Sequence, residues 1–264
     1  MFVPEHPDAL LRFGFKFGKG GAHAARTMML AELQHLLEAF PEDVQHADYR
    51  AAVVETNLLD KPTVSARKLT FRHLQNLYAL SPSSCLFRIF RKLWGQDRDS
   101  QPVLALQMAL TRDTLLRSSV PWVLAIPQEE SFQREKLERM LSETDDGRFT
   151  PASLKSFAQN INGTWTQAGY LRGHVKKIRS QPVITPTNVT FALFLGYLDG
   201  RLARRLFTSD WVRVLDLPEE RLIELTQAAA QRGLLVFRRT GTVMEVRFPD
   251  YLTEQEQEWL SEQA

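Results

Sequence analysis

The stretch of residues 150–181 constrains the fold more than any other, because it joins a helical pattern directly to a basic ribbon. Thr150 can cap a helix with its hydroxyl, and Pro151 follows at the first helical position, where a missing N–H is tolerated. Gly169 then ends the helix. One face of this helix collects the apolar residues Leu154, Phe157, Ala158, Ile161 and Trp165. A helix, a glycine and a short hairpin in this order predict a winged helix.

The ribbon after Gly169 alternates apolar and basic residues. We predict that Val175 and Ile178 form the packed side of the hairpin, while its other edge carries charge of one sign. Such an edge needs a partner of opposite charge, which phosphate supplies. The residues of this wing that we expect to contact DNA are Arg172, His174, Lys176, Lys177 and Arg179.

The same order of features recurs towards the C-terminal end. Residues 231–235 echo residues 167–171, and Gly241 lies where a hairpin turn is expected within residues 234–248. Arg238 and Arg239 in this second hairpin are further candidates for DNA contacts. Two helix–glycine–strand units in one chain favour a nucleic-acid-binding architecture.

The charge balance confines any nucleic-acid surface to local clusters. The 264 residues include 33 Lys and Arg against 31 Asp and Glu, a net charge of +2, so the chain is not uniformly basic. The single cysteine, Cys85, excludes an internal disulfide and a thiolate metal cluster, and we expect it to be a small buried side chain. Without a signal-peptide pattern or a membrane-length apolar run, we expect a cytoplasmic protein with no membrane partner.

Residues 49–80 predict two helices joined by a turn. The first helix is expected to end near Asn57, and Pro62 and Thr63 begin the second. We expect the second helix to bury Ala66, Leu69, Leu74 and Leu77 and to turn its basic residues elsewhere, namely Arg67, Lys68, Arg72 and His73. This is helix-turn-helix spacing, which makes Arg67, Lys68 and Arg72 candidates for DNA contacts. The same cations also fit the solvated face of a bundle helix, and the residues alone leave both interpretations open.

Residues 55–80, ETNLLDKPTVSARKLTFRHLQNLYAL, contain Asn-Leu-Leu, a Thr or Ser a few residues on, and a basic helix ending in leucine. This segment resembles the N-terminal signature of the BrxA family of bacteriophage-exclusion (BREX) loci. The resemblance covers roughly the first half of the chain, and the remainder only by architecture, since the tail from Leu217 onward has no motif that aligns. It implies a mostly helical, non-enzymatic protein, related to NusB-like and winged-helix folds, that binds double-stranded DNA in phage defence.

These patterns together predict a mainly α fold with small β-hairpins. We expect three parts: a helical N-terminal domain over residues 1–127, NusB-like or with the helix-turn-helix segment, a first winged-helix-like unit over residues 128–183, and a second over residues 184–264. The last unit should end in an acidic helix that docks through Leu252, Trp259 and Leu260.

A search for catalytic motifs finds no HExxH, CxxC or GxSxG pattern, and the six histidines are scattered. The glycines around residues 18–21 lack the Lys-Ser/Thr end of a P-loop and predict a tight turn. Asp145 and Asp146 beside Gly147 predict an exposed turn in preference to a metal site. We therefore expect no enzymatic activity, no metal and no cofactor. The expected partners are double-stranded DNA and possible further proteins of a defence system; the alternatives are a protein–protein scaffold and a NusB-like RNA-binding protein.

Overall fold

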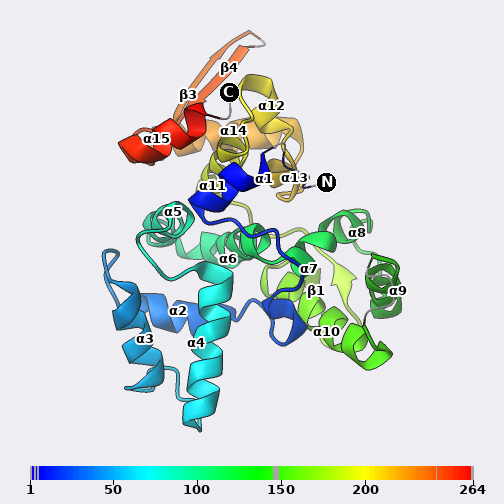
Figure 1. Ribbon diagram of the computed structural model, residues 1–264. Coiled ribbons are helices and arrows are strands. Elements are labelled where there is room, and N and C mark those ends of the chain that lie inside the picture. The colour runs from blue at the N-terminus through cyan, green and yellow to red at the C-terminus, as the bar shows by residue number, and fades with distance from the viewer. Residues whose placement is uncertain (1, 3, 5, 145–148, 242, 263–264) are drawn as a thin grey trace.

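The computed structural model describes residues 2, 4, 6–144, 149–241 and 243–262. The chain is mainly helical, with two small antiparallel hairpins of two strands each, which confirms the predicted fold class. Figure 1 shows the two central helices, α6 and α11, with the other elements arranged around them.

The first part of the chain packs around α6. Its elements are α1 (Pro7–Phe13), the 3₁₀-helix η1 (Ala22–Ala24), α2 (Leu30–Glu38), α3 (His46–Val54), α4 (Val64–Tyr78), α5 (Cys85–Trp94), the 3₁₀-helix η2 (Arg98–Ser100), α6 (Gln101–Arg112), α7 (Thr114–Ser118) and α8 (Val120–Leu124). Helix α6 is buried along almost its whole length, because α4, α5 and α11 all contact it. A helix that is apolar on every side is stable only when neighbours cover every side.

The middle of the chain has the helix–helix–hairpin order of a winged helix. It comprises α9 (Arg134–Thr144), α10 (Pro151–Gln167), β1 (Leu171–Arg172) and β2 (Ile178–Arg179). As expected, the Thr150 hydroxyl caps α10, accepting a hydrogen bond from the N–H of Ser153 at 3.2 Å. Ser131 forms an antiparallel bridge to Ile178, so the residues before α9 lie along the free edge of β2.

The last part repeats this order. It comprises α11 (Pro186–Leu198), α12 (Ala203–Phe207), α13 (Asp210–Arg213), α14 (Glu219–Gln231), β3 (Val236–Thr240), β4 (Val243–Arg247) and α15 (Glu254–Ser261). Thr185 and Asn188 form a capping box at the start of α11, and Thr253 and Glu256 form one at the start of α15. Gly241 lies in the turn between β3 and β4 with a positive φ, as its place in the sequence predicted.

The two ends of the chain meet. The ring of Phe13 in α1 packs edge-on against Trp259 of α15 at 5.7 Å, and Arg12 pairs with Glu262 at 2.6 Å. The predicted docking of the acidic terminal helix through Trp259 is thus confirmed. These contacts join the first predicted domain to the third, and the division of the chain at residues 127 and 183 stays a prediction.

The segment between α1 and α2 is a loop that contains η1. Helix α1 ends at Phe13, and Phe15 and Phe17 lie in this loop. Helix α2 begins only at Leu30, after η1 and a left-handed Met29 with φ of 55°. The glycine-rich turn is held by Thr114, whose hydroxyl donates towards the carbonyls of Gly18 and Gly20 at 2.9 and 2.7 Å.

Within the described ranges, no helix is both long enough and apolar enough to cross a bilayer.

Candidate nucleic-acid interface

Helix α10 has one buried face and one polar face. Its five predicted apolar residues are all buried, which fixes the rotation of the helix. The opposite face carries Lys155, Ser156 and Gln159, which are exposed, and the half-buried Asn162. An α-helix with its side chains is about 10–12 Å across, which fits the major groove of B-DNA, about 12 Å wide. Side-chain amides such as those of Gln159 and Asn162 can pair with the edge of adenine in that groove.

The β1–β2 hairpin stands beside this polar face. A pocket of about 440 Å³ opens between them, and its lining includes Gln159 and Asn162 from the helix and Lys176 and Lys177 from the hairpin. Lys176 is exposed, whereas Lys177 is half-buried and donates to the carbonyl of Gly173 at 2.6 Å. The hairpin therefore contributes cations to this surface and the helix contributes amides.

Arg179 does not belong to the exposed charge of the hairpin. Its side chain is 0% exposed and forms an ion pair with Asp216, while its guanidinium also donates to the carbonyls of Tyr170 and Ser180. The guanidinium lies 5.3 Å from the centre of the Tyr170 ring. The expectation that Arg179 is free to contact DNA is wrong, because the side chain points into the protein and joins the hairpin to the loop after α13.

The packed side of the hairpin also differs from expectation. Val175 was predicted to pack, but it lies at the tip and is 95% exposed. The residues that do pack are Tyr170 and Leu171, with Ile178 half-buried. The strands have only two residues each, so the apolar–basic alternation does not continue into the five residues, 173–177, that connect them. His174 shares this exposed tip.

Arg172 is exposed at the base of the same hairpin. It forms an ion pair with Glu129, which partly offsets its charge. We therefore assign the free positive charge of the wing to Lys176 and Lys177.

Helix α4 holds the N-terminal candidates, and they divide into two groups. Lys68 and Arg72 are exposed one turn apart on the same face. Arg67 is half-buried and donates to the carbonyls of Val54 and Glu55 at 3.1 and 3.4 Å, so it ties α4 to the end of α3. His73 was expected to point away from the core, but only 9% of it is exposed.

The second hairpin lies far from the first. Figure 1 shows β3 and β4 projecting at the top, with β1 and α10 on the lower right. Arg238 and Arg239 are both exposed on β3, and Arg238 stands opposite Glu245 in the strand register. The sequence-predicted residues are therefore not gathered on one surface: the wing of β1–β2, helix α4 and the β3–β4 hairpin are three separate places.

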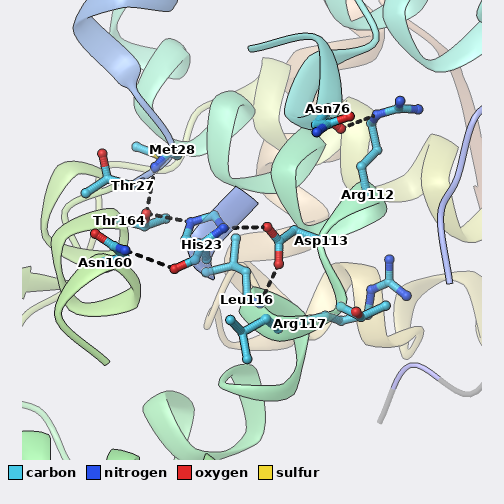
Figure 2. A network of polar contacts seen from close by, with 12 residues as sticks. His23, Thr27, Met28, Asn76, Arg112, Asp113, Leu116, Arg117, Asn160 and Thr164 are labelled. Carbon is cyan, nitrogen blue, oxygen red and sulfur yellow. Dashed lines mark hydrogen bonds and ion pairs between the residues drawn. The ribbon is translucent and has the colours of Figure 1, made fainter. Parts of the chain in front are cut away.

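A buried set of polar contacts holds α10 against the rest of the chain (Figure 2). Nδ1 of His23 lies 2.8 Å from a carboxylate oxygen of Asp113, and Nε2 lies 2.8 Å from the hydroxyl oxygen of Thr164 in α10. The same hydroxyl oxygen accepts the N–H of Met28 at 2.8 Å, and the Asn160 amide donates to the His23 carbonyl at 3.0 Å. We name His23, Asp113 and Thr164 the buried triad.

Two glycines permit the close approaches around the triad. A Cβ on Gly21 would lie 2.1 Å from an oxygen of Asp113, and a Cβ on Gly163 would lie 2.7 Å from the methyl group of Thr27. Glycine in the middle of a helix lowers its stability, so its presence at residue 163 is explained by this contact. The backbone of α10 therefore packs directly against the segment after η1.

The buried triad resembles the carboxylate–imidazole–hydroxyl series of a hydrolase, but its surroundings exclude that role. Each of its three side chains is at most 1% exposed, so no substrate reaches the hydroxyl of Thr164. Burial acts to raise the pKa of Asp113, yet the adjacent His23 ring and the hydrogen bonds from the N–H groups of His23 and Leu116 hold that pKa below its usual value. The buried triad is therefore a structural contact that holds α10 in place, with an ionised carboxylate at one end.

No group of three or more His, Cys, Asp or Glu side chains able to hold a metal ion occurs within the residues that the structure describes. Asp145, Asp146 and Gly147, considered above as a turn or a metal site, lie outside the described residues. Cys85 is buried as expected, and burial raises the pKa of its thiol.

Sequence reasoning did not single out the polar face of α10. Lys155 and Gln159 were recoverable, because they occupy the helical positions opposite the apolar face of α10.

A comparison with protein families finds no match to this chain, and a comparison with curated proteins finds none either.

Proposed function

We propose that this protein binds double-stranded DNA through the polar face of α10 and the β1–β2 hairpin, without enzymatic activity, as a cytoplasmic component of a bacterial anti-phage defence system of the BREX type. The observation that supports DNA binding most directly is the pairing of a free polar helix face with an exposed basic hairpin across one pocket. In a winged helix these two elements contact the major groove and the adjacent phosphates.

The β1–β2 hairpin and helix α10 carry different polar groups, and this combination suits duplex DNA. Lysine amines on the hairpin neutralise backbone phosphates irrespective of sequence, and amides on a helix distinguish base edges. The major groove of an RNA duplex is too deep and narrow to admit a helix. This geometry favours DNA over the NusB-like RNA-binding alternative.

Competition between nucleic acids tests the proposal. A labelled DNA duplex bound to the protein is challenged with unlabelled duplex DNA or with structured RNA of equal length. We expect the DNA to displace the label at least about tenfold more effectively than the RNA. Equal or stronger competition by RNA would favour the NusB-like alternative, and no binding of either would remove the nucleic-acid proposal.

Removing the two free cations of the wing is expected to weaken DNA binding without unfolding the protein. In the double variant Lys176→Ala/Lys177→Ala, each lost phosphate contact should reduce the log–log salt slope by about one. The melting temperature should stay nearly unchanged, since charges near the surface contribute little to stability. Fluorescence anisotropy over a salt series measures both the affinity and the slope.

The β3–β4 hairpin offers a matched control. Arg238→Ala/Arg239→Ala removes two positive charges from an exposed hairpin at the other end of the molecule. We expect this variant to bind DNA as the parent does. If Arg238→Ala/Arg239→Ala lost DNA binding and Lys176→Ala/Lys177→Ala kept it, the DNA contact would have to be on β3–β4 instead.

We expect no turnover of nucleotides, nucleic acids or small esters by the purified protein. The carboxylate–imidazole–hydroxyl series of Asp113, His23 and Thr164 is closed to solvent. Chelation with EDTA should leave both folding and DNA binding unchanged. Reproducible nuclease or ATPase activity that co-elutes with the protein, and is lost in a point variant, would contradict this.

The defence role rests on the resemblance of residues 55–80 to the BrxA family. These residues follow α3 and form the turn and α4, with the Thr63 hydroxyl capping α4 by accepting the N–H of Ala66 at 3.1 Å. Deletion of the gene in its native host, followed by phage plating, tests the role. Plating efficiency that rises on deletion and falls on complementation is expected, and unchanged plating across a phage panel would count against it.

A scaffold role has one observation in its favour. An apolar pocket of about 380 Å³ lies between the end of α11 and α15, lined by Tyr197, Leu202, Phe248, Leu252 and Leu260 among others. Leu202 at its rim is 60% exposed. A Leu202→Asp variant that keeps DNA binding but loses phage protection would support a protein contact there, whereas full protection would remove it.

A further inference from the structure

A short loop before η1, residues 14–21, is held in place through its carbonyl groups. Arg112, at the end of α6, donates to the carbonyl of Gly14. Arg117, on α7, donates to the carbonyl of Lys16 at 2.9 Å. The hydroxyl at the start of α7 binds two more carbonyls of the loop, as described above. The loop therefore uses its hydrogen-bond acceptors to pack against the junction between α6 and α7.

The N–H groups in the middle of this loop are left over. Within the described part of the chain, no backbone or side-chain group accepts from the N–H groups of residues 17–20. Gly18 and Lys19 are exposed, and a Cβ added at Gly18 or Gly20 would meet no atom within 4 Å. The loop therefore combines unused hydrogen-bond donors with open space beside it. Glycine-rich loops with free N–H groups are a common means of binding phosphate.

Gly18 is the one glycine of this run that packing does not explain. Gly20 has a left-handed φ of 93°, and Gly21 lies too close to Asp113 to carry a side chain. At Gly18 the φ is not in the left-handed region, and an added side chain would meet nothing. The missing side chain leaves the backbone uncovered, which permits a ligand to approach it closely.

Cations from three elements meet at this loop. The amine of Lys16 donates to the side-chain oxygen of Asn76 on α4 at 3.4 Å. Nε of Arg112 donates to the backbone carbonyl of the same residue at 2.9 Å (Figure 2). These two charges are thus held beside one residue, and Lys19 adds a third, exposed in the loop itself.

Arg117 adds a buried charge behind the loop. Only 6% of the residue is exposed, and its guanidinium lies 4.9 Å from the centre of the Phe17 ring. Its printed hydrogen bonds all go to backbone carbonyls, because the neighbouring carboxylate of Asp113 is bonded to the His23 ring. Burial lowers the pKa of Arg112 and of Arg117 to about 10. Both guanidinium groups stay charged at neutral pH, and their field favours an anion at the loop.

We propose that residues 16–20 bind one phosphate group, with Lys16 and Lys19 as its counter-charges and the free N–H groups of the loop as its hydrogen-bond donors. A phosphate offers several oxygen acceptors to donors of both kinds, and lysine is a common partner for it. Free nucleotides and the nucleic-acid backbone both carry such a group. The proposal does not depend on DNA binding by α10, and it assigns no hydrolysis to the loop.

Inorganic phosphate is the probe that tests the site. It is titrated into ¹⁵N-labelled full-length protein at constant ionic strength held with chloride, and the amide signals of Gly18, Lys19 and Gly20 are followed by NMR. We expect these signals to shift saturably, with a Kd of about 1 mM or tighter. In Lys16→Ala/Lys19→Ala the affinity read from the two glycine signals should fall at least about tenfold. Loop signals that do not respond in the parent would overturn the inference.

Two control variants separate the site from a general effect of charge. Lys16→Arg/Lys19→Arg keeps both charges and should keep phosphate binding. Arg204→Ala/Arg205→Ala removes two exposed cations from α12 and should bind phosphate as the parent does. Equal weakening in the α12 variant and in Lys16→Ala/Lys19→Ala would overturn the loop as the site. If the double alanine variant does not fold, Lys19→Ala alone, which truncates an exposed side chain, must still weaken binding.

A second titration, with duplex DNA, identifies the source of the phosphate. The same loop signals should move if the ligand is a nucleic-acid backbone, and should stay in place if it is a free phosphate compound. Either result supports the site, whose existence the inorganic phosphate titration alone decides. The wing variant Lys176→Ala/Lys177→Ala tests the proposed function separately, so failure of the loop and failure of DNA binding by α10 are distinguishable.

Discussion

Arg179→Ala is expected to destabilise the protein by about 3 kcal/mol, although Arg179 sits in a basic ribbon whose other members are exposed or half-exposed. Removing one partner of a buried ion pair leaves the other without compensation, at a loss of about 3–5 kcal/mol. The lower value applies because the side chain of Asp216 is 32% exposed and still accepts from Gln128 at 3.1 Å. Urea unfolding measures the loss.

The neighbouring cation Arg172 supplies the control. It is exposed on the paired strand and forms an ion pair with Glu129, whose side chain is also exposed. Arg172→Ala should therefore change the free energy of unfolding by no more than about 0.5 kcal/mol. If Arg179→Ala were as mild as Arg172→Ala, the buried pairing of Arg179 with Asp216 would be wrong.

Asp113→Ala should destabilise the protein by about 3–5 kcal/mol. The carboxylate accepts from the His23 ring, from the N–H of His23 at 3.0 Å and from the N–H of Leu116 at 3.0 Å, where it caps α7. These donors are buried, and each buried donor left without a partner costs about 1–3 kcal/mol. Asp113→Ala should lower both the free energy of unfolding and the affinity for DNA, because the same contacts hold α10 in place.

A second capping aspartate gives the comparison for Asp113. Asp97 caps η2 by accepting from the N–H of Asp99 at 3.1 Å, in an exposed setting. Asp97→Ala should cost about 1 kcal/mol, as an ordinary helix cap does. Equal losses in the two variants would show that the buried triad adds nothing beyond capping.

The pH dependence of the Asp113 contribution follows from its lowered pKa. A group whose pKa is depressed by folding stabilises the folded state above its unfolded value, here 3.8, and loses that contribution as pH falls through its folded value. The difference in stability between the parent and Asp113→Asn should therefore be constant above about pH 5 and shrink below pH 3.8. A difference that grows on acidification would contradict the ionised carboxylate.

Local patterns predicted the helices well, because caps and glycine stops act within one turn. Thr150 with Pro151, and Thr185 with Pro186, mark the starts of α10 and α11 where the structure has them. The apolar periodicity of α10 fixed its buried face and, by exclusion, the face that bears Gln159. The helix that carries the candidate site was thus predictable from sequence.

The long-range polar contacts were not predictable in the same way. Arg179 and Lys177 are close neighbours in one basic ribbon, but the Arg179 side chain is buried and pairs with a carboxylate 37 residues further on. His23 has its two ring partners 90 and 141 residues away, so no spacing in the sequence marks it.

Salt dependence of duplex DNA binding by the parent protein tests the central claim most directly. A footprint of roughly 4 to 6 phosphate contacts, with Lys155, Lys176 and Lys177 among the contacting residues, predicts a log–log slope of about −4 to −5. The measurement is a set of anisotropy titrations of one duplex between about 50 and 200 mM salt, the range over which such contacts change the affinity by orders of magnitude. Affinity that falls steeply along this slope is the predicted result, and affinity that stays flat across the series would contradict the account.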